Sequence, residues 1–197
     1  MTNDEMYALS KLQTTKQHFS ETKETLKSLI DRTITSIDIP QGMTNIGSQS
    51  FNQCRDLASV TIPDSVTNIG SYAFCNCNSL ASIIIPSSVT SLQANVFINC
   101  DSLTDVFIPN SVTRVAVTSF SGCSSLTNVT LGDGFNANNL DLSASTLYSA
   151  DTLVAILNAL ADRTGQTAYT LTLGSTNLAK LTNEQIAIAT QKNWTLA

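Results

Sequence analysis

Charged side chains are scarce in this sequence. Lysine, arginine, aspartate and glutamate make up 13% of its 197 residues, about half the share usual in a soluble domain, and the formal net charge at pH 7 is −5. Between residues 33 and 131 the only basic side chains are those of Arg55 and Arg114. Nucleic-acid binding and docking on an anionic membrane both require a face rich in lysine and arginine, so the composition argues against both kinds of partner.

Long apolar runs are also missing. No run approaches the roughly 18 residues that a transmembrane helix needs. The opening segment, residues 1–30, has mixed charge and lacks the apolar region of a secretory signal peptide. We therefore expect no membrane insertion and no export through the usual signal. The sequence does not fix the location of the protein: a cytoplasmic protein, a component of a virion and a relative of surface proteins are all compatible with it.

Groups that could carry catalysis are few. His18 is the only histidine, and neither a Gly-x-Ser-x-Gly motif nor a phosphate-binding glycine pattern occurs. Asp101 and Asp105 are the closest pair of aspartates in the third repeat, and we interpret them as part of a solvated rim rather than as an acid–base pair. Residues 132–134, Gly-Asp-Gly, are typical of a turn and lack the ligand spacing of a calcium loop. The sequence predicts a protein that is not an enzyme and needs no cofactor or metal ion.

What the sequence does contain is a repeat with a period of 23 positions. Four residue types recur at this interval and stay in register with one another, which is the signature of a repeat architecture. The recurring residues are Pro40, Pro63, Pro86 and Pro109; Phe51, Phe74, Phe97 and Phe120; Cys54, Cys77, Cys100 and Cys123; and Leu57, Leu80, Leu103 and Leu126. Four independent columns with one period leave almost no room for coincidence.

The unit at residues 57–74 shows how such a repeat is expected to fold. Residues 57–63 alternate apolar and polar side chains, which predicts a strand, and the proline at its end lacks the N–H that a sheet ladder needs. Residues 66–69 predict a second short strand, Gly70 a tight corner, and the segment around Phe74 a short helical or 3₁₀ turn. Because one unit cannot bury its apolar side alone, we expect copies to stack about 4.8 Å apart, with each column forming a ladder in a continuous core.

This repeat resembles the BspA-like branch of the leucine-rich repeat family. The shared unit is Leu-x-x-Val-x-Ile-Pro, then Val-Thr-x-Ile-Gly, then Ala-Phe-x-x-Cys-x-x-Leu, and the match covers about residues 34–131. The fourth copy departs from it, with Val115 and Ala116 in place of Ile-Gly, and the fifth breaks off at residues 132–134. The resemblance implies a curved, right-handed solenoid used for recognition of proteins or surfaces, and it implies no catalytic residues.

Four of the five cysteines form one of the repeated columns, and Cys75 stands outside it. Zinc needs four ligands that converge on a tetrahedron, whereas stacked thiols point the same way, so a metal site is not expected. Disulfides between rungs are an alternative, because Cα atoms about 5 Å apart are within the permitted range, but parallel Cβ vectors make the dihedral angle unfavourable. We interpret the column as a buried packing ladder and expect Cys75 to be the more exposed thiol.

Residues 1–33 are predicted to form a segment of their own. Residues 4–31 contain neither glycine nor proline and place apolar residues at alternating spacings of three and four, with Lys16 and Lys23 in the same seam. One interpretation is a helix that packs over the first rung as an N-terminal cap. The other is a short coiled coil that joins chains into a homo-oligomer.

Residues 136–197 predict longer strand–helix units that continue the same sheet and form a C-terminal cap. The expected elements are strands at residues 140–142, 169–174 and 194–196, a helix at about residues 150–162, and a second helix with Thr182 as its N-cap. Four residues of the first helix are expected to share one face: Ala155, Ile156, Ala159 and Leu160. We interpret Trp194 as a plug in this cap rather than as a ligand platform.

The outward positions of the predicted strands hold the candidate binding site. One outward column is polar at its ends and holds two large apolar residues, Ile84 and Phe107, at adjacent rungs in its middle. Exposed apolar side chains flanked by polar ones have the composition of a contact patch. We therefore predict ligand binding by Phe107 and Ile84, with Asp105 and Thr61 at the rim. The alternative is that the pair merely packs together or is covered by a neighbouring chain.

The sequence thus predicts an α/β solenoid, a leucine-rich repeat stack of about 23-residue rungs over residues 34–135 with caps at both ends. The predicted function is a non-enzymatic recognition module of the adhesion type, which presents a sheet face to a protein or cell-surface ligand. The alternative is a structural component of a phage tail or oligomeric fibre, joined through residues 4–31. The closing stretch, residues 171–197, is similar to a segment of repeat proteins from gut Firmicutes and their phages, which bears on location and not on fold.

Overall fold

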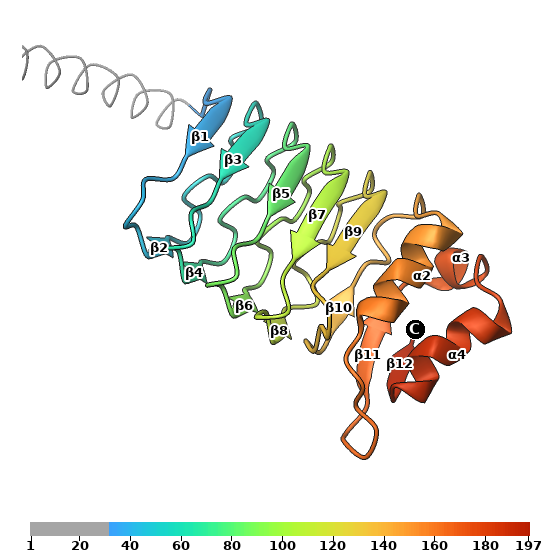
Figure 1. Cartoon of the computed structure of the whole chain (residues 1–197). Coiled ribbons are helices and arrows are strands. Elements are labelled where there is room, and N and C mark those ends of the chain that lie inside the picture. The colour runs from blue at the N-terminus through green and yellow to red at the C-terminus, as the bar shows by residue number, and fades with distance from the viewer. Residues whose placement is uncertain (1–31) are drawn as a thin grey trace, which may run out of the picture.

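The computed structural model describes residues 32–197, so the segment 4–31, for which a helix or coiled coil is predicted, lies outside the described residues. The described chain winds into a stack of short parallel strands (Figure 1). One column consists of β1 (Ser36–Asp38), β3 (Ser59–Thr61), β5 (Ser82–Ile84), β7 (Asp105–Ile108) and β9 (Asn128–Leu131). The second consists of β2 (Asn45–Ile46), β4 (Asn68–Ile69), β6 (Ser91–Leu92) and β8 (Arg114–Val115). Strands paired within these columns are offset by 23 positions, which confirms the predicted period.

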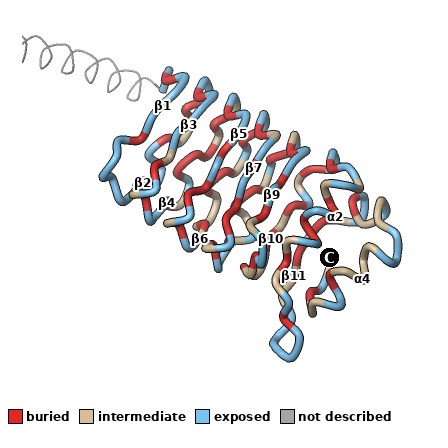
Figure 2. The backbone as a smooth tube through the Cα atoms, viewed as in Figure 1, coloured by how far each residue is buried: buried red, intermediate tan, exposed pale blue. Residues whose placement is uncertain are grey.

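Alternation along the strands of the first column sends every second side chain into the core. In β5, Ile83 is buried while Ser82 and Ile84 are exposed, and the same alternation recurs in β7 and β9. Buried positions therefore recur at equivalent places in successive rungs, as the repeated red segments of Figure 2 show. The result is a core made of ladders that run the length of the stack.

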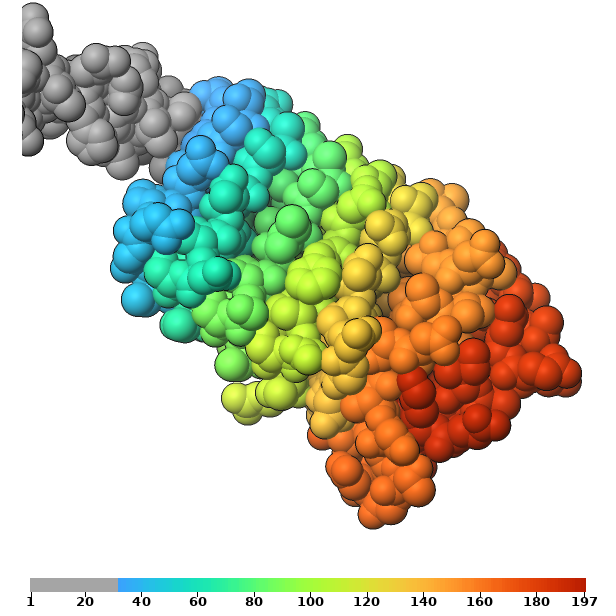
Figure 3. Space-filling model, in the orientation of Figure 1, coloured from blue at the N-terminus to red at the C-terminus, as the bar shows by residue number. Residues whose placement is uncertain are grey.

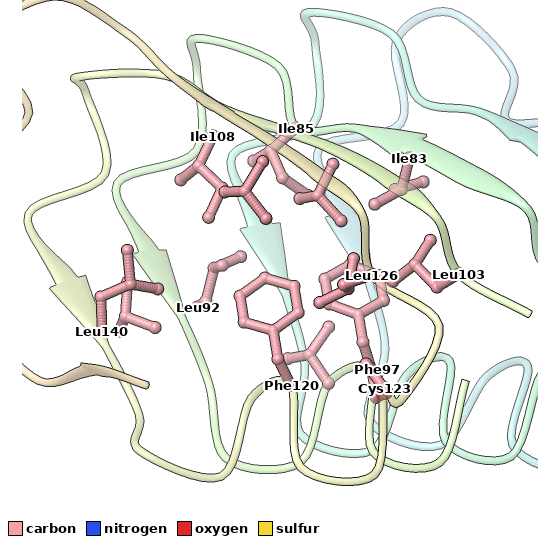
Figure 4. Close-up of a cluster of buried hydrophobic side chains, with 14 of the residues drawn as sticks. Ile83, Ile85, Leu92, Phe97, Leu103, Ile108, Phe120, Cys123, Leu126 and Leu140 are labelled. Atoms are coloured by element: carbon pink, nitrogen blue, oxygen red, sulfur yellow. The ribbon is translucent and has the colours of Figure 1, made fainter. Parts of the chain in front are cut away.

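The phenylalanine column is the most regular of these ladders. The rings of Phe51, Phe74, Phe97 and Phe120 are buried and nearly parallel, with successive centroids 5.2, 5.6 and 5.5 Å apart. Figure 4 shows Phe97 and Phe120 among the buried aliphatic side chains. The predicted alignment of the columns is therefore confirmed, because residues that are 23 positions apart lie face to face.

The segment around Phe74 is not the helical or 3₁₀ turn that the sequence predicts. The N–H groups of Ala73 and Cys75 donate to carbonyls three residues earlier, but those of Phe74 and Asn76 donate to Val96 and Ile98 of the next rung. Asn76 has a φ of 57°, outside the right-handed region that any helix requires. The segment is a chain of tight turns, and it forms a third ladder of hydrogen bonds between rungs.

Gly70 is required by the close approach of two rungs. A Cβ atom at this position would lie 2.5 Å from the backbone nitrogen of Ser48, in the preceding repeat. The N–H of Gly70 also donates to the carbonyl of Ile46 at 2.8 Å, so the two backbones cannot separate without losing this bond. The glycine at this corner therefore permits backbone contact between neighbouring rungs.

Both strand columns are interrupted at the same place, between the second and third repeats. The first column divides into the sheets β1–β3 and β5–β7–β9, and the second into β2–β4 and β6–β8. Just before β3 and β5 two backbone bonds still join the repeats, from the N–H of Ala81 to the carbonyl of Ala58 at 3.3 Å and from the N–H of Ser79 to the carbonyl of Arg55 at 3.0 Å. The turn ladder and the stacking of Phe74 on Phe97 continue across this junction. Ser88 Oγ also donates to the carbonyl of Val66 across it, and the core is continuous, so the two halves stay joined although the strand pairing is interrupted.

The C-terminal strands do not continue the first sheet, so that expectation is wrong. β10 (Leu140–Asp141), β11 (Tyr169–Thr172) and β12 (Trp194–Leu196) form a parallel sheet of their own. An isolated bridge between Arg114 and Asn138 links this region to the second column instead. The reason lies just after β9, where Phe135 exchanges backbone hydrogen bonds with Ala159 and Ala161 and thereby directs the chain away from the first column.

The helices differ from expectation in length and orientation. α2 (Ala150–Ala159) ends earlier than predicted, because the pairing of Phe135 with residues 159–161 replaces further helical hydrogen bonds. Its buried residues are Leu153, Ile156 and Leu157, whereas Ala155 is exposed, so the predicted shared face is wrong in part. α3 (Ser175–Leu178) was not expected from the sequence. Thr182 is the N-cap of α4 (Asn183–Gln191), as predicted, and its side chain accepts a hydrogen bond from the N–H of Gln185.

Trp194 is buried at the C-terminal end of the fold. Only 2% of its surface is exposed, and its Nε1–H donates to the carbonyl of Ala161 at 2.9 Å. Its ring meets Tyr169 edge-on, with centroids 5.7 Å apart, and the guanidinium of Arg163 lies 3.4 Å from the centroid of the same tyrosine ring. An indole in this position fills the interior and is not a surface platform for a ligand.

We expect the Phe97→Ala variant to lose about 3–5 kcal/mol of unfolding free energy, because the deletion empties the middle of the phenylalanine ladder. Urea unfolding followed by circular dichroism measures this change. Val117→Ala is the matched control: Val117 is 54% exposed, so its truncation should change stability by less than about 0.5 kcal/mol. A loss below about 1 kcal/mol in Phe97→Ala would show that the ladder does not carry the stability assigned to it.

Candidate functional site

The candidate site lies on the outer face of the β5–β7–β9 sheet. Ile84 and Phe107 are direct partners in the parallel register and stand side by side on this face. Their exposed fractions are 68% and 36%, so water reaches both of them. Their inward neighbours Ile83 and Val106 are buried, which fixes the outward direction of the pair through strand alternation. The structure therefore brings together the two apolar residues that the sequence analysis selected.

A polar row accompanies the apolar pair. Ser82, Asp105 and Asn128 are partners across β5, β7 and β9, two positions before Ile84, Phe107 and Thr130 along their strands. The side chains of both rows border a shallow depression of about 240 Å³ in the sheet face. The site thus has an apolar centre and a polar rim of hydroxyl, amide and carboxylate groups.

Asp105 is the charged member of this rim. Its carboxylate accepts a hydrogen bond from Thr104 Oγ1 at 2.6 Å and another from Asn128 Nδ2 at 3.1 Å. Both bonds lower the pKa of Asp105 below its usual value because they stabilise the ionised form, and the bond from Thr104 has the larger effect. The side chain is exposed, so the rim presents a fixed negative charge at neutral pH.

Thr61 occupies a different position from the other three predicted residues. It is exposed at the end of β3, on the far side of the interrupted pairing between β3 and β5. Asn128 and Thr130 of β9 take its place beside the apolar pair, and the sequence analysis did not select them. Asn128 and Thr130 follow Asp105 and Phe107 by one repeat period, so the repeat could have indicated that they lie beside the pair. Nothing in the sequence, however, shows where the strand pairing is interrupted.

The cysteine column is a buried ladder of thiols, as the sequence analysis predicted. All five cysteines are free and buried, and Cys75, at 7%, is the most exposed of them. The thiols of Cys77, Cys100 and Cys123 donate to the carbonyls of the phenylalanines 26 residues earlier, at 3.2, 3.1 and 3.0 Å. Burial raises the pKa of Cys77 and of Cys123 to about 12 and also raises that of Cys100. These three thiols therefore serve as hydrogen-bond donors within the core.

Two further features of the described part of the chain bear on the site. Among residues 32–197, no group of three or more histidine, cysteine, aspartate or glutamate residues is arranged to hold a metal ion. In the same range, every helix is too short or too polar to cross a lipid bilayer.

The comparison with protein families addresses the repeat directly. The family described as the BspA type leucine-rich repeat region matches residues 26–144, in six copies. The chain belongs to this family. The match includes every strand of both columns, so the sheet face described above is a face of BspA-type repeats.

Solved structures of other leucine-rich repeat proteins resemble the chain. A leucine-rich cell surface protein from Faecalibacterium prausnitzii is 32% identical, with 50% of this chain and 32% of that chain covered and a TM-score of 0.41. The T. pallidum leucine-rich repeat protein is 22% identical, with 83% and 72% covered and a TM-score of 0.48. One from Bacteroides ovatus is 23% identical, with 74% and 44% covered and a TM-score of 0.40. The chain spans about a third of the length of the F. prausnitzii protein. The search of curated proteins found no match to this chain.

We expect the thiols of this BspA-type repeat protein to be unreactive toward a thiol reagent until the protein unfolds. Titration with 5,5′-dithiobis(2-nitrobenzoate) should find no rapidly reacting cysteine in the native protein, even at about pH 9, because burial keeps the thiols protonated. All five should react after unfolding in guanidinium chloride. Cys75→Ala is the control, since it removes the most exposed thiol and should leave the native protection of the others unchanged. Fewer than five thiols in the unfolded, unreduced protein would instead indicate a disulfide.

Proposed function

We propose that this BspA-type repeat protein is a non-enzymatic recognition module whose β5–β7–β9 face binds a protein or cell-surface ligand, as in adhesion. The observation that carries the proposal is the exposed pair of Ile84 and Phe107 on a sheet face with a polar rim. In the monomer a large part of both side chains stays in contact with water, whereas a partner that covers them gains the burial of that remaining surface. Burying both would contribute roughly 2–4 kcal/mol to binding.

The scaffold suits this role because the face is ordered before a partner arrives. Each strand is short, but its backbone is held by the equivalent strands of adjacent rungs, and its inward side chains belong to the continuous core. Association with a rigid surface avoids the entropy loss that accompanies the ordering of a loop. The low charge of the repeats also suits short-range contact better than long-range electrostatic steering.

We further infer that residues 136–197 act as the C-terminal cap of the repeats. α2 lies against β9, where the next strand of the first column would otherwise pair. The Nζ of Lys192 donates to the carbonyls of Leu157, Asn158 and Leu160 at the end of α2, which ties α4 to that helix.

The alternative role in a phage tail or fibre stays a prediction, since the joining segment 4–31 lies outside the described residues.

The Ile84→Ser and Phe107→Ser double variant tests the proposal. The labelled wild-type chain is applied to an array of extracellular proteins and glycans, and every ligand that it binds is then measured with the variant. We expect affinity to fall by at least about tenfold, because the apolar centre of the contact is lost.

Val117→Ser is the control for this experiment, because it removes an exposed apolar residue that does not border the depression. Its binding should equal that of the wild type, and thermal unfolding should confirm that all variants are folded. An array on which no interaction depends on Ile84 and Phe107 would contradict the proposal.

A further inference from the structure

A second hollow lies beside the depression at the apolar pair. A space of about 450 Å³ lies between β9 and α2, bordered by Asp133, Thr152, Ala155 and Asn158 together with β9 itself. Asn128 and Thr130 border both hollows, so the two lie side by side, and together they make a surface, called the trough below, that runs from β5 across β7 and β9 to α2. In Figure 3 the surface of α2, in orange, lies directly beside the ochre surface of β9.

The charged side chains that border the trough are all acidic. Asp105 stands in its first part and Asp133 in its second, and both side chains are exposed. No lysine or arginine is among the residues that border either hollow. The charge of Asp105 is moreover held in place by the bonds from Thr104 and Asn128. Nucleic acids and acidic glycans would meet repulsion here, whereas a cationic ligand would meet two carboxylates.

The remaining surface of the trough favours an extended polypeptide. Ile84 and Phe107 offer apolar contact at one end, and Ala155 with the half-buried Ala159 leaves a smooth wall at the other. Between them, the exposed side chains of Thr130 and Asn158 can exchange hydrogen bonds with a peptide backbone. Hydrophobic contact, backbone-directed hydrogen bonds and negative charge are thus all available on the surface of the trough.

We propose that the trough binds an extended segment of a partner protein in which lysine or arginine residues alternate with apolar ones. The apolar side chains pack on Ile84 and Phe107, and the cationic groups pair with Asp105 and Asp133. This inference rests on the proposed function and adds to it the chemistry of the partner and the part played by β9 and α2.

The experiment uses the full chain and three fluorescein-labelled heptapeptides. In the first, lysine alternates with phenylalanine and isoleucine; in the second, glutamate replaces lysine; in the third, serine replaces the apolar residues. Fluorescence anisotropy should show the lysine peptide binding more than about tenfold more tightly than the glutamate peptide. Raising sodium chloride from about 20 to about 500 mM should reduce that difference, because salt screens exposed charges. The serine peptide should bind more weakly than the lysine peptide.

The double variant Asp105→Asn and Asp133→Asn should weaken binding of the lysine peptide by about three- to tenfold, the range expected for two exposed ion pairs. Asp64→Asn is the matched control, since Asp64 is exposed but borders neither hollow, and it should bind as the wild type does. Equal binding of the lysine and glutamate peptides, an unchanged affinity in the double variant, or no binding of any peptide would overturn the inference. Unchanged binding of the lysine peptide to the Ile84→Ser and Phe107→Ser double variant would overturn both this inference and the role that the proposed function gives to the apolar pair, whereas the charge-dependent outcomes above bear on the inference alone.

Discussion

Contact between each residue and its equivalent 23 positions away is the constraint on which the structure depends. The same offset governs the strand pairs, the stacked phenylalanines, and polar bonds such as that from Asn99 to Asn76. One repeat has too little apolar surface to fold alone. A repeat stacked between two copies of itself buries its inward side chains against the equivalent side chains of both neighbours. The stability of each rung is therefore a property of the interface between rungs.

The interface at which the strand pairing is interrupted determines the extent of the candidate site. Between the second and third repeats both strand columns lose their regular pairing, and the turn ladder and the core maintain the connection. The face that carries Ile84 and Phe107 is consequently a sheet of three strands, with β5 at one edge and β9 at the other. Thr61 is separated from this face by the interruption, although its place in the repeat is equivalent to that of Ile84 and Phe107.

The end of the repeat array contributes to the site as well as to the fold. Because Phe135 pairs with residues 159–161, the first column ends at β9, and a helix rather than another strand lies beside it. This change turns a flat sheet face into a trough with a wall on one side. Asp133 belongs to the turn that makes the change, so the residue that extends the negative charge of the site is also part of the junction between repeats and C-terminal units.

The sequence by itself determined the repeat, its period, the family and the inward or outward direction of side chains such as Ile83 and Ile84. These follow from periodicity, because a fixed repeat length and a two-residue alternation leave little freedom once the copies stack. Only the tertiary structure decided where the ladders break, that the turns at Phe74 are not helical, which sheet β10 joins and which face of α2 is buried. Those outcomes depend on competition between hydrogen-bond partners far apart in the chain, such as Phe135 and residues 159–161, and no local pattern records which partner prevails.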